Sequence, residues 1–283
     1  MRDVIARYGL DARRSLGQHF LLDLNLTRRI ARAAGDIAHG TVIEIGPGPG
    51  GLTRALLELG ARRIVAVERD ERCVAALGEV AAAYPGRLKI VAGDALAIDA
   101  AVIGKPPRRI VANLPYNIST ALLVRWLEHA DAFESLTLMF QREVAERLAA
   151  RPGGKDYGRL SVLAQWLCEV ELLFNIAKEA FVPAPKIVST VVQLRPRPKP
   201  LAEAPSEALQ AVTAAAFGQR RKMLRASLRG LVADPAELLN AAGIEPTLRA
   251  EALSVEQFCA LARHYAGGAG RRDGVAISPG GAP

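Results

Sequence analysis

The feature that most constrains the fold is a regular alternation of short apolar runs with amphipathic segments between residues 41 and 150. Each run has the length and composition of a strand buried on both faces, and a segment with helical spacing follows it. This alternation predicts an α/β fold with a Rossmann-like, doubly wound and mostly parallel sheet. The runs interpreted as strands are Thr41–Ile45, Arg63–Val67, Leu88–Ala92, Arg109–Ala112 and Ser135–Phe140.

The segments between and after these runs are interpreted as helices. Ser119 or Thr120 is the expected cap of the helix that ends near His129. Two later runs, Glu169–Asn175 and Ile187–Leu194, predict a hairpin that closes the sheet. The other expected helices are Asn25–Ala34, Leu52–Leu59, Asp70–Ala83, Arg142–Ala150 and Leu160–Cys168.

A proline-rich segment, residues 195–200, is the best candidate for a domain boundary because prolines stiffen a linker. Beyond it the pattern is helical to about Tyr265, and the last residues are rich in glycine and proline. We therefore predict a sheet domain of residues 1–196, a small all-helical domain of residues 197–265, and a disordered tail of residues 266–283.

A glycine-rich loop follows the first predicted strand and opens the next helix. Gly46 and Gly48 allow the backbone to approach a ligand closely, and the helix N-terminus favours negative charge. With Gly51, the same glycines also fit the fingerprint of dinucleotide-binding folds, so the loop alone leaves two cofactor classes open. Glu68, at the end of the next strand, is placed to bind ribose hydroxyls in either class.

Three features favour S-adenosylmethionine over a dinucleotide. Glu44 precedes the loop, where an acid suits a cationic ligand better than a pyrophosphate. Pro47 and Pro49 remove N–H donors that a pyrophosphate needs. Asp94, after the third strand, is placed to accept a hydrogen bond from an adenine amine. Either acid alone is as well explained by a structural cap, but their occurrence at successive strand ends favours a class I methyltransferase fold.

The tetrapeptide Asn113-Leu114-Pro115-Tyr116 follows the fourth predicted strand, where open α/β sheets bind their ligands. Asn113 offers a carbonyl acceptor, Pro115 restricts the backbone, and Tyr116 offers a flat face for stacking. The set suits a planar base with an exocyclic amine, although a capped turn with a packed tyrosine has the same sequence. We hypothesise that the Asn113 side chain and the Leu114 backbone carbonyl accept hydrogen bonds from such an amine.

The net charge of +8 is concentrated in one segment. Eight basic and two acidic residues lie between Arg195 and Arg229, which favours contact with nucleic-acid phosphates over a plain solvated surface. No apolar run approaches the length of a membrane span, and the N-terminus lacks the apolar region of a signal peptide. Three widely spaced cysteines predict neither a disulfide framework nor a zinc site, so a cytoplasmic protein without metal is expected.

With these motifs in order, the chain resembles the ribosomal RNA adenine N6,N6-dimethyltransferases over residues 10–265. The resemblance includes five further blocks, of which the last is the most discriminating and points to the small-subunit branch. One departure is visible, because His19 stands where the family usually has asparagine. The blocks are Leu16–Leu21, Gln141–Arg147, Tyr157–Ser161, Phe181–Ser189 and Phe217–Leu224.

The resemblance implies roles for individual residues. It implies Asn113, Leu114, Tyr116 and Phe181 as the residues at the reacting base, with Tyr116 and Phe181 as stacking platforms. It implies phosphate contacts for Arg220, Arg221, Lys222 and Arg225, some of which we expect to be structural instead. The implied contacts of S-adenosylmethionine are Gln18, His19, Leu21, Glu44, Gly46, Gly48, Glu68, Arg69, Asp94, Ala95 and Asn113.

The function implied is dimethylation of two adjacent adenosines in the 3′-terminal hairpin of small-subunit rRNA, by a monomer acting on that rRNA or on a pre-small-subunit particle. Two alternatives stay open at this point. One is a large-subunit rRNA dimethyltransferase that confers macrolide resistance, against which residues 217–224 argue. The other is a ribosome-assembly factor without catalytic activity, against which the intact Asn113, Tyr116, Glu68 and Asp94 argue. A nicotinamide-dependent oxidoreductase would leave the basic segment unexplained.

Overall fold

The structure of the chain is a computed structural model, and it describes residues 2–10 and 19–270. The chain divides into two compact units. Of the described residues, 2–10, 19–149 and 167–198 form the sheet unit, and 150–166 and 199–270 form the helical unit. Within the described ranges, no helix is both long and apolar enough to cross a lipid bilayer.

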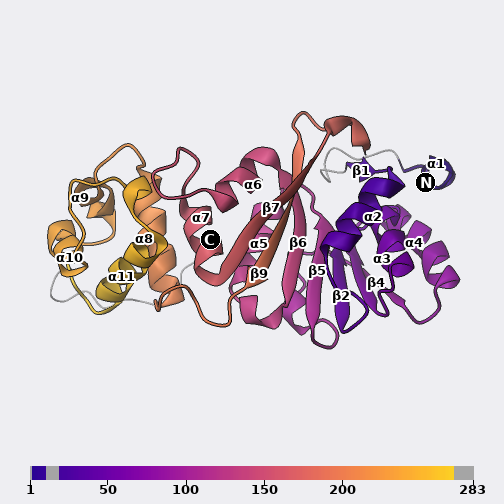
Figure 1. Cartoon of the computed structure of the whole chain (residues 1–283), viewed down its shortest axis with the longest axis horizontal. Coiled ribbons are helices and arrows are strands. Elements are labelled where there is room, and N and C mark those ends of the chain that lie inside the picture. Colours follow the sequence, from indigo (N-terminus) through magenta and orange to yellow (C-terminus); the bar gives the residue numbers. More distant parts are fainter. Residues whose placement is uncertain (1, 11–18, 271–283) are drawn as a thin grey trace. The chain divides into compact units, whose positions relative to one another are not determined.

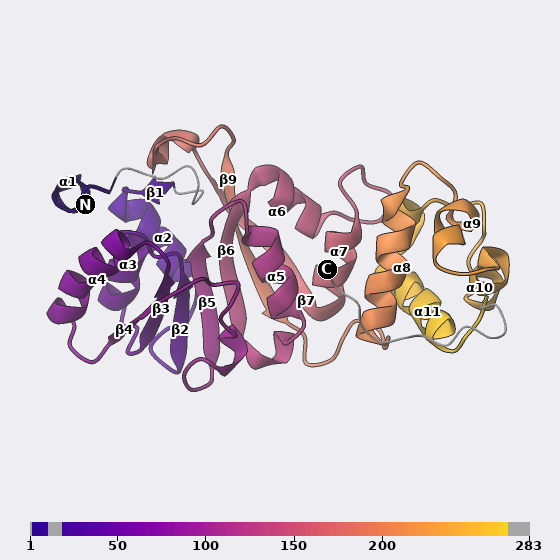
Figure 2. The same ribbon diagram turned by 180° about the vertical axis from the view of Figure 1, so that it is seen from behind.

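The sheet unit is built on seven strands in the order β4-β3-β2-β5-β6-β9-β7 (Figures 1 and 2). The pairs from β4 to β6 are parallel, whereas β9 is antiparallel to both β6 and β7. The predicted Rossmann-like, mostly parallel sheet is therefore confirmed. Its strands are β2 (Thr41–Ile45), β3 (Ile64–Glu68), β4 (Leu88–Ala92), β5 (Arg108–Asn113), β6 (Ser135–Gln141), β7 (Cys168–Ile176) and β9 (Ser189–Pro196).

Burial on both faces of the sheet explains why the inner strands are short, continuous apolar runs in the sequence. Every residue of β2 and β3 is buried, as expected for inner strands covered on both faces, whereas the edge strand β4 is only partly buried. The helices of the sheet unit are α1 (Arg2–Arg7), α2 (Leu24–Ala33), α3 (Gly51–Glu58), α4 (Glu71–Ala83), α5 (Ser119–Leu127) and α6 (Arg142–Ala149). Short 3₁₀ turns occur at η2 (Ala100–Val102), η3 (Ala130–Ala132) and η4 (Lys178–Ala180).

Helix α5 begins differently from the prediction. Ile118 occupies the N-cap position without a side-chain hydrogen bond, and Ser119 is already helical. The Ser119 hydroxyl donates to the carbonyl oxygen of Tyr116 at 3.1 Å instead of accepting from the helix. The expectation that Ser119 or Thr120 caps α5 is therefore wrong, because the hydroxyl of Ser119 bonds back to the preceding loop.

A second, two-stranded sheet was not predicted. Strand β1 (Phe20–Leu21) pairs antiparallel with β8 (Phe181–Val182), with Phe20 opposite Val182 and Leu21 opposite Phe181. The two strands are about 160 residues apart in the chain, and each is too short to give a periodic signal. This pairing joins the segment after residue 19 to the connection between β7 and β9.

The helical unit includes a segment that the sequence analysis placed in the sheet domain. Residues 150–166, with most of α7 (Arg159–Leu167), cluster with the residues after 199. Trp166 explains this, because its indole N–H donates to the carbonyl oxygen of Ala202 at 2.7 Å and its own carbonyl accepts from the N–H of Leu201 at 2.8 Å. The N–H of Gly153 likewise donates to the carbonyl oxygen of Glu251.

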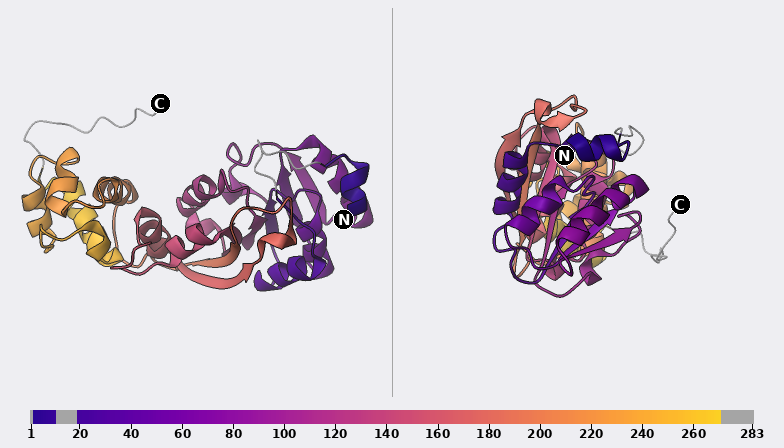
Figure 3. Two further views of the ribbon diagram at one scale, coloured as in Figure 1. Left: turned by 90° about the horizontal axis from the view of Figure 1, so that it is seen from above. Right: turned by 90° about the vertical axis from the view of Figure 1, so that its right-hand side faces the viewer.

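The rest of the helical unit consists of helices joined by turns, seen in orange and yellow in Figure 3. An aromatic group occupies its core: the ring of Phe217 packs edge-on against Tyr157 and tilted against Phe258. Gly270 ends the described part and accepts hydrogen bonds from the N–H groups of residues 233 and 234. The helices are α8 (Ser206–Gly218), α9 (Leu224–Ser227), α10 (Pro235–Ala241) and α11 (Val255–Ala266), with 3₁₀ turns η5 (Leu228–Gly230) and η6 (Ala250–Ala252). The tail predicted to be disordered begins at residue 266, but Ala266 still belongs to α11 and residues 267–270 form turns. The rest of that tail, residues 271–283, lies outside the described residues.

Tyr157 gives a test of this core. Its side chain is fully buried, and its hydroxyl has no hydrogen-bond partner among the residues that the structure describes. A buried hydroxyl without a partner costs stability, so Tyr157→Phe should raise the free energy of unfolding by about 1 kcal/mol in a denaturant titration. Tyr8→Phe is the control, because that hydroxyl donates to Glu79 at 2.7 Å and its loss should give no such rise. A lower stability for Tyr157→Phe would contradict this account of the core.

Candidate active site

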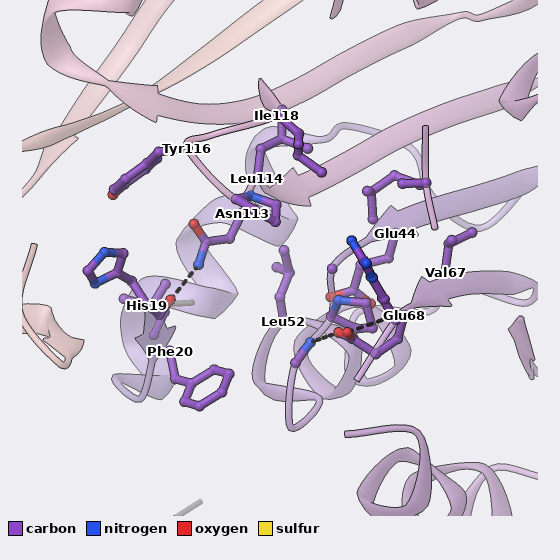
Figure 4. A pocket seen from close by; sticks show the side chains of 18 of the residues that line it. His19, Phe20, Glu44, Leu52, Val67, Glu68, Asn113, Leu114, Tyr116 and Ile118 are labelled. Atoms are coloured by element: carbon purple, nitrogen blue, oxygen red, sulfur yellow. Dashed lines mark hydrogen bonds between the residues drawn. The ribbon is translucent and has the colours of Figure 1, made fainter. Parts of the chain in front are cut away.

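A cavity of about 160 Å³ lies at the carboxyl ends of the central strands. The strand order reverses between β2 and β5, which is the place where open α/β sheets bind ligands. Figure 4 shows the side chains that converge there. The lining comes from residues 19–21, from the loop after β2, from the end of β3, from residues 93–96 after β4, and from residues 113–118 after β5.

Nearly all of the residues expected to contact a cofactor line this cavity. They are His19, Leu21, Glu44, Gly46, Gly48, Glu68, Arg69, Asp94, Ala95 and Asn113. Gln18 was also expected there, but it lies outside the described residues. The spatial convergence of segments so far apart in the chain supports their assignment to one binding site.

The loop between β2 and α3 is held in a conformation that favours glycine. Gly46 and Gly48 have φ values of +65° and +55°, a region that other residues rarely adopt. A Cβ atom on Gly48 would lie 3.1 Å from two ring carbons of Phe20, so the absence of a side chain lets that ring close on the loop. Phe20 is a wall residue that the sequence analysis did not single out, although it belongs to the block around Gln18.

Glu68 holds this loop against the next strand. Its Oε2 accepts from the N–H of Gly48 at 3.0 Å, and its Oε1 accepts from the N–H groups of Arg69 and Asp70, each at 2.8 Å. Burial raises the pKa of Glu68, and these three N–H donors oppose the rise. A carboxylate has about four acceptor positions, so Glu68 retains capacity for a ligand hydroxyl.

Glu44 is the most unusual group in the cavity wall. The side chain is 1% exposed, and neither carboxylate oxygen has a hydrogen-bond partner of normal geometry among residues 2–10 and 19–270. Burial raises the pKa of Glu44 from its ordinary value of 4.5 to about 8, with the carboxylate of Glu68 adding to the rise and the polar groups of Thr53 opposing it. A buried carboxyl group of this kind suits a cationic ligand, because a bound cation would offset the cost of its ionisation.

Asp94 and Arg69 lie on the more open side of the cavity. Asp94 Oδ1 accepts from the N–H of Leu96 at 2.9 Å, and Oδ2 pairs with the Arg69 guanidinium at 3.3 Å. Both side chains are substantially exposed, so solvent screens this ion pair and it contributes little stability. Asp94 is therefore free to exchange Arg69 for a ligand amine.

Asn113 ends β5 and is oriented by the backbone of His19. Its Nδ2 donates to the carbonyl oxygen of His19 at 3.0 Å, as Figure 4 shows. A carbonyl oxygen only accepts, so this contact assigns the amide orientation and leaves Oδ1 available as an acceptor. Leu114 follows with its side chain buried in the core.

Tyr116 is held beside this amide by two contacts. Its hydroxyl shares a 2.6 Å hydrogen bond with the hydroxyl of Ser189, a fully buried residue that the sequence analysis did not weigh as a site residue. The His19 imidazole stacks on its ring, with centroids 5.4 Å apart and the planes inclined by 30°. Burial raises the pKa of the Tyr116 hydroxyl and Ser189 opposes the rise, so the group stays protonated at neutral pH.

Phe181 is not brought into the cavity. It is 2% exposed and packs in the hydrophobic core of the sheet unit, while its backbone pairs with Leu21 in the β1–β8 sheet. The expectation that Phe181 is a stacking platform is not supported by this arrangement, because its ring is covered by core residues. His19, and not Phe181, is the aromatic partner of Tyr116 here.

The four residues expected to contact RNA all lie in the helical unit, but they differ in their surroundings. Arg220 is partly buried, and its Nη2 donates to the carbonyl oxygen of Gly154 at 3.2 Å, so it joins two segments of that unit. Arg221, Lys222 and Arg225 are exposed. The expectation that some of these cations are structural therefore applies to Arg220.

The cavity as a whole fits S-adenosylmethionine. Glu44 would hold a cationic group, Glu68 would bind ribose hydroxyls, and Asp94 would accept from the adenine amine, while Gly46 and Gly48 leave room for close approach. In the part of the chain that the structure describes, no cluster of three or more His, Cys, Asp or Glu residues could hold a metal ion.

The raised pKa of Glu44 predicts how stability depends on pH without cofactor. Between about pH 4.5 and 8 the unfolded chain releases the Glu44 proton while the folded protein keeps it, so stability falls as pH rises through this window. Relative to Glu44→Gln, the wild type should lose about 3 kcal/mol of unfolding free energy between pH 5 and pH 8. Denaturant titrations of both proteins measure this loss, and parallel pH profiles would show that Glu44 is not held protonated.

Comparisons with known proteins agree with this site. The chain matches the family model described as ribosomal RNA adenine dimethylase over residues 9–266. It is 66% identical over 263 residues to the ribosomal RNA small subunit methyltransferase A of Rhodospirillum rubrum, covering 93% of this chain and 91% of that protein. The protein of the same name from Paramagnetospirillum magneticum is also 66% identical, with 93% of each chain covered.

Solved structures show the same fold. A dimethyladenosine transferase from Plasmodium falciparum aligns with a TM-score of 0.74 at 24% identity, over 86% of this chain and 96% of that one. The 23S rRNA methyltransferase ErmE aligns with a TM-score of 0.65 at 30% identity, over 87% of this chain and 99% of that one. The chain therefore belongs to the ribosomal RNA adenine dimethylase family, whose members transfer methyl groups from S-adenosylmethionine.

Proposed function

We propose that this enzyme transfers methyl groups from S-adenosylmethionine to N6 of two adjacent adenosines in the 3′-terminal hairpin of small-subunit rRNA, forming N6,N6-dimethyladenosine. The observation that carries the proposal is the orientation of Asn113, whose amide is fixed by the His19 carbonyl so that Oδ1 remains free beside Tyr116. The 66% identity to two proteins named ribosomal RNA small subunit methyltransferase A supports the choice of rRNA.

The chemistry of the target nitrogen sets what the protein must do. Adenine N6 is a poor nucleophile because its lone pair is delocalised into the ring. In the first transfer, Asn113 Oδ1 and the Leu114 backbone carbonyl would each accept one N6 hydrogen bond, which favours a tetrahedral nitrogen and stabilises the positive charge that develops on it. In the second transfer, the one remaining N–H would donate to one of these two acceptors. Glu44, Glu68 and Asp94 would hold S-adenosylmethionine, which would supply an electrophilic methyl group with a neutral thioether as its leaving group.

The remaining groups position the base and the cofactor. Tyr116, fixed through Ser189, offers its ring as a stacking face for an adenine taken out of its helix. The N6 proton passes to solvent after transfer, so no side chain with a shifted pKa is needed as a base. Positioning and charge stabilisation therefore account for the proposed catalysis.

The exposed cations of the helical unit supply affinity for the RNA backbone in this proposal. Arg221, Lys222 and Arg225 would contact phosphates, whose attraction does not depend on sequence. We propose that the substrate is small-subunit rRNA or a pre-small-subunit particle in the cytoplasm. We also propose that the enzyme acts as a monomer, since one chain supplies the described walls of the cavity.

Methylation of large-subunit rRNA is the weaker alternative. The 23S rRNA methyltransferase ErmE shares 30% of aligned residues with this chain, compared with 66% for the relatives named for the small subunit. A role without catalysis is not favoured either, because Glu68, Asp94, Asn113 and Tyr116 are all present around one cavity.

Asn113→Ala tests the assigned chemistry. Loss of one acceptor at the reacting nitrogen should lower the methylation rate by roughly 10²- to 10³-fold. Calorimetry should give an almost unchanged affinity for S-adenosylmethionine, because Glu44, Glu68 and Asp94 remain. Asn117→Ala is the matched control, since Asn117 is an exposed amide in the same loop. If cofactor affinity falls as far as the rate in Asn113→Ala, the role assigned to Asn113 is wrong.

The salt dependence of RNA binding tests the helical unit. Lys222→Ala should weaken binding of the hairpin and reduce the slope of log affinity against log salt by about 1. Arg62→Ala removes a cation that is also exposed, from the sheet unit between α3 and β3, and should leave the slope unchanged. Equal slopes for the wild type and Lys222→Ala would show that Lys222 makes no phosphate contact.

A further inference from the structure

The stacked pair formed by His19 and Tyr116 leaves no room for a base. The two ring centroids are 5.4 Å apart, and Figure 4 shows both side chains on the same side of the cavity as Asn113. A base inserted between two parallel rings needs about 7 Å between them, because stacked rings lie about 3.5 Å apart. The imidazole therefore covers the ring face on which a base bonded to Asn113 would have to stack.

The backbone of His19 is held firmly in place. Its carbonyl oxygen accepts from Asn113 Nδ2 at 3.0 Å, and the next two residues form strand β1, which pairs with β8. The main chain at this position is thus tied both to the end of β5 and to the second sheet. A change at His19 that leaves the backbone in place would keep the orientation of Asn113.

The His19 side chain is held more loosely than its backbone. Its Nδ1 lies 2.8 Å from the carbonyl oxygen of Pro183, and because a carbonyl only accepts, Nδ1 carries the proton and donates. Among the residues that the structure describes, the imidazole makes this hydrogen bond and the ring contact with Tyr116. The ring is half-buried, so rotation about its side-chain bonds can move it away from Tyr116 without disturbing β1.

We infer that the His19 imidazole occupies the place of the target base on Tyr116 while no RNA is bound, and that the base enters by displacing it. The inference rests on the proposed function, because it takes adenine as the entering group. A flat aromatic ring with an N–H donor satisfies both the Tyr116 face and the Pro183 carbonyl. His19 thus lowers the affinity for the base and keeps the stacking face covered until a competing base arrives.

The size of the expected change in KM follows from the ring contact between His19 and Tyr116 that the base must replace. An aromatic pair of this kind shifts an equilibrium by roughly two- to tenfold. His19→Asn removes the ring and retains a side-chain N–H group that can donate to the Pro183 carbonyl. At saturating S-adenosylmethionine, this variant should lower KM for the hairpin RNA by roughly two- to tenfold.

The direct test follows the imidazole by NMR in protein labelled with ¹³C-histidine and loaded with S-adenosylhomocysteine. The chain has four histidines, so the His19 signal is identified by its loss in His19→Asn. In the free protein, Tyr116→Leu should remove the ring-current shift from this signal. A hairpin carrying both target adenosines should shift the signal in the same way. The same hairpin with abasic target nucleotides should bind through its phosphates and leave the signal in place.

The NMR and kinetic results distinguish an imidazole that the base displaces from one that stays in place or helps to bind the base. The inference would be overturned if the chemical shift of His19 does not change with the adenosine hairpin, or if it changes equally with the abasic hairpin. A higher KM for His19→Asn would also overturn the inference, because the His19 ring would then contribute to binding of the base. His39→Asn is the matched control: that histidine is exposed, bonds to Asp36 and does not line the cavity, so KM should not change. If the wild type binds neither hairpin, the proposed function fails, and Tyr116→Leu still decides whether the two rings are stacked.

Discussion

Parallel pairing of β2 with β3 and β5 brings segments that are far apart in the chain to one edge of the sheet. Each strand delivers a different polar group to that edge, since Glu68 ends β3 and Asn113 ends β5. The carboxylate of Glu68 then fixes the glycine loop through the N–H of Gly48. Without this alignment of strand ends, the cofactor groups and the amide proposed to act on the base would not share a cavity.

One residue of the cavity wall, Glu44, is buried at a large cost in free energy that no described residue offsets by a hydrogen bond of normal geometry. Glu44 is buried with no hydrogen-bond partner of normal geometry in the described ranges, and burial of a carboxyl group disfavours its charged form. Such a cost is typical of functional sites, where a bound ligand supplies the charge or hydrogen bonds that the protein itself does not supply. Arg221, Lys222 and Arg225 of the helical unit, in contrast, are exposed and available for phosphates.

The parts of the fold that could be predicted are those encoded by local patterns. The bounds of β2 and β4 agree with the apolar runs. The glycine loop and Asp94 follow strands, and Glu68 and Asn113 lie at strand ends, as expected. Features that depend on distant contacts were missed. The β1–β8 pairing, the burial of Phe181 and the stacking of His19 on Tyr116 each join segments with no local signal of their neighbour.

The boundary between the two units also depends on contacts between segments that are far apart in the chain. Prolines near residue 196 mark a change of pattern, but residues 150–166 join the helical unit through Trp166 and Gly153 after the chain has already left most of the sheet. A unit built from two separate stretches of chain cannot be recognised from one linear boundary. The hydrogen-bond partners of Trp166 lie more than thirty residues further along the chain.

The central claim is that this chain dimethylates adenosines of small-subunit rRNA. The most direct measurement incubates the purified protein with labelled S-adenosylmethionine and either unmethylated small subunits or large-subunit rRNA, and maps the modified nucleosides by mass spectrometry. We expect N6,N6-dimethyladenosine at two adjacent positions of the 3′-terminal hairpin in the small-subunit sample alone. Label in the large-subunit RNA, or no label in either sample despite cofactor binding, would contradict it.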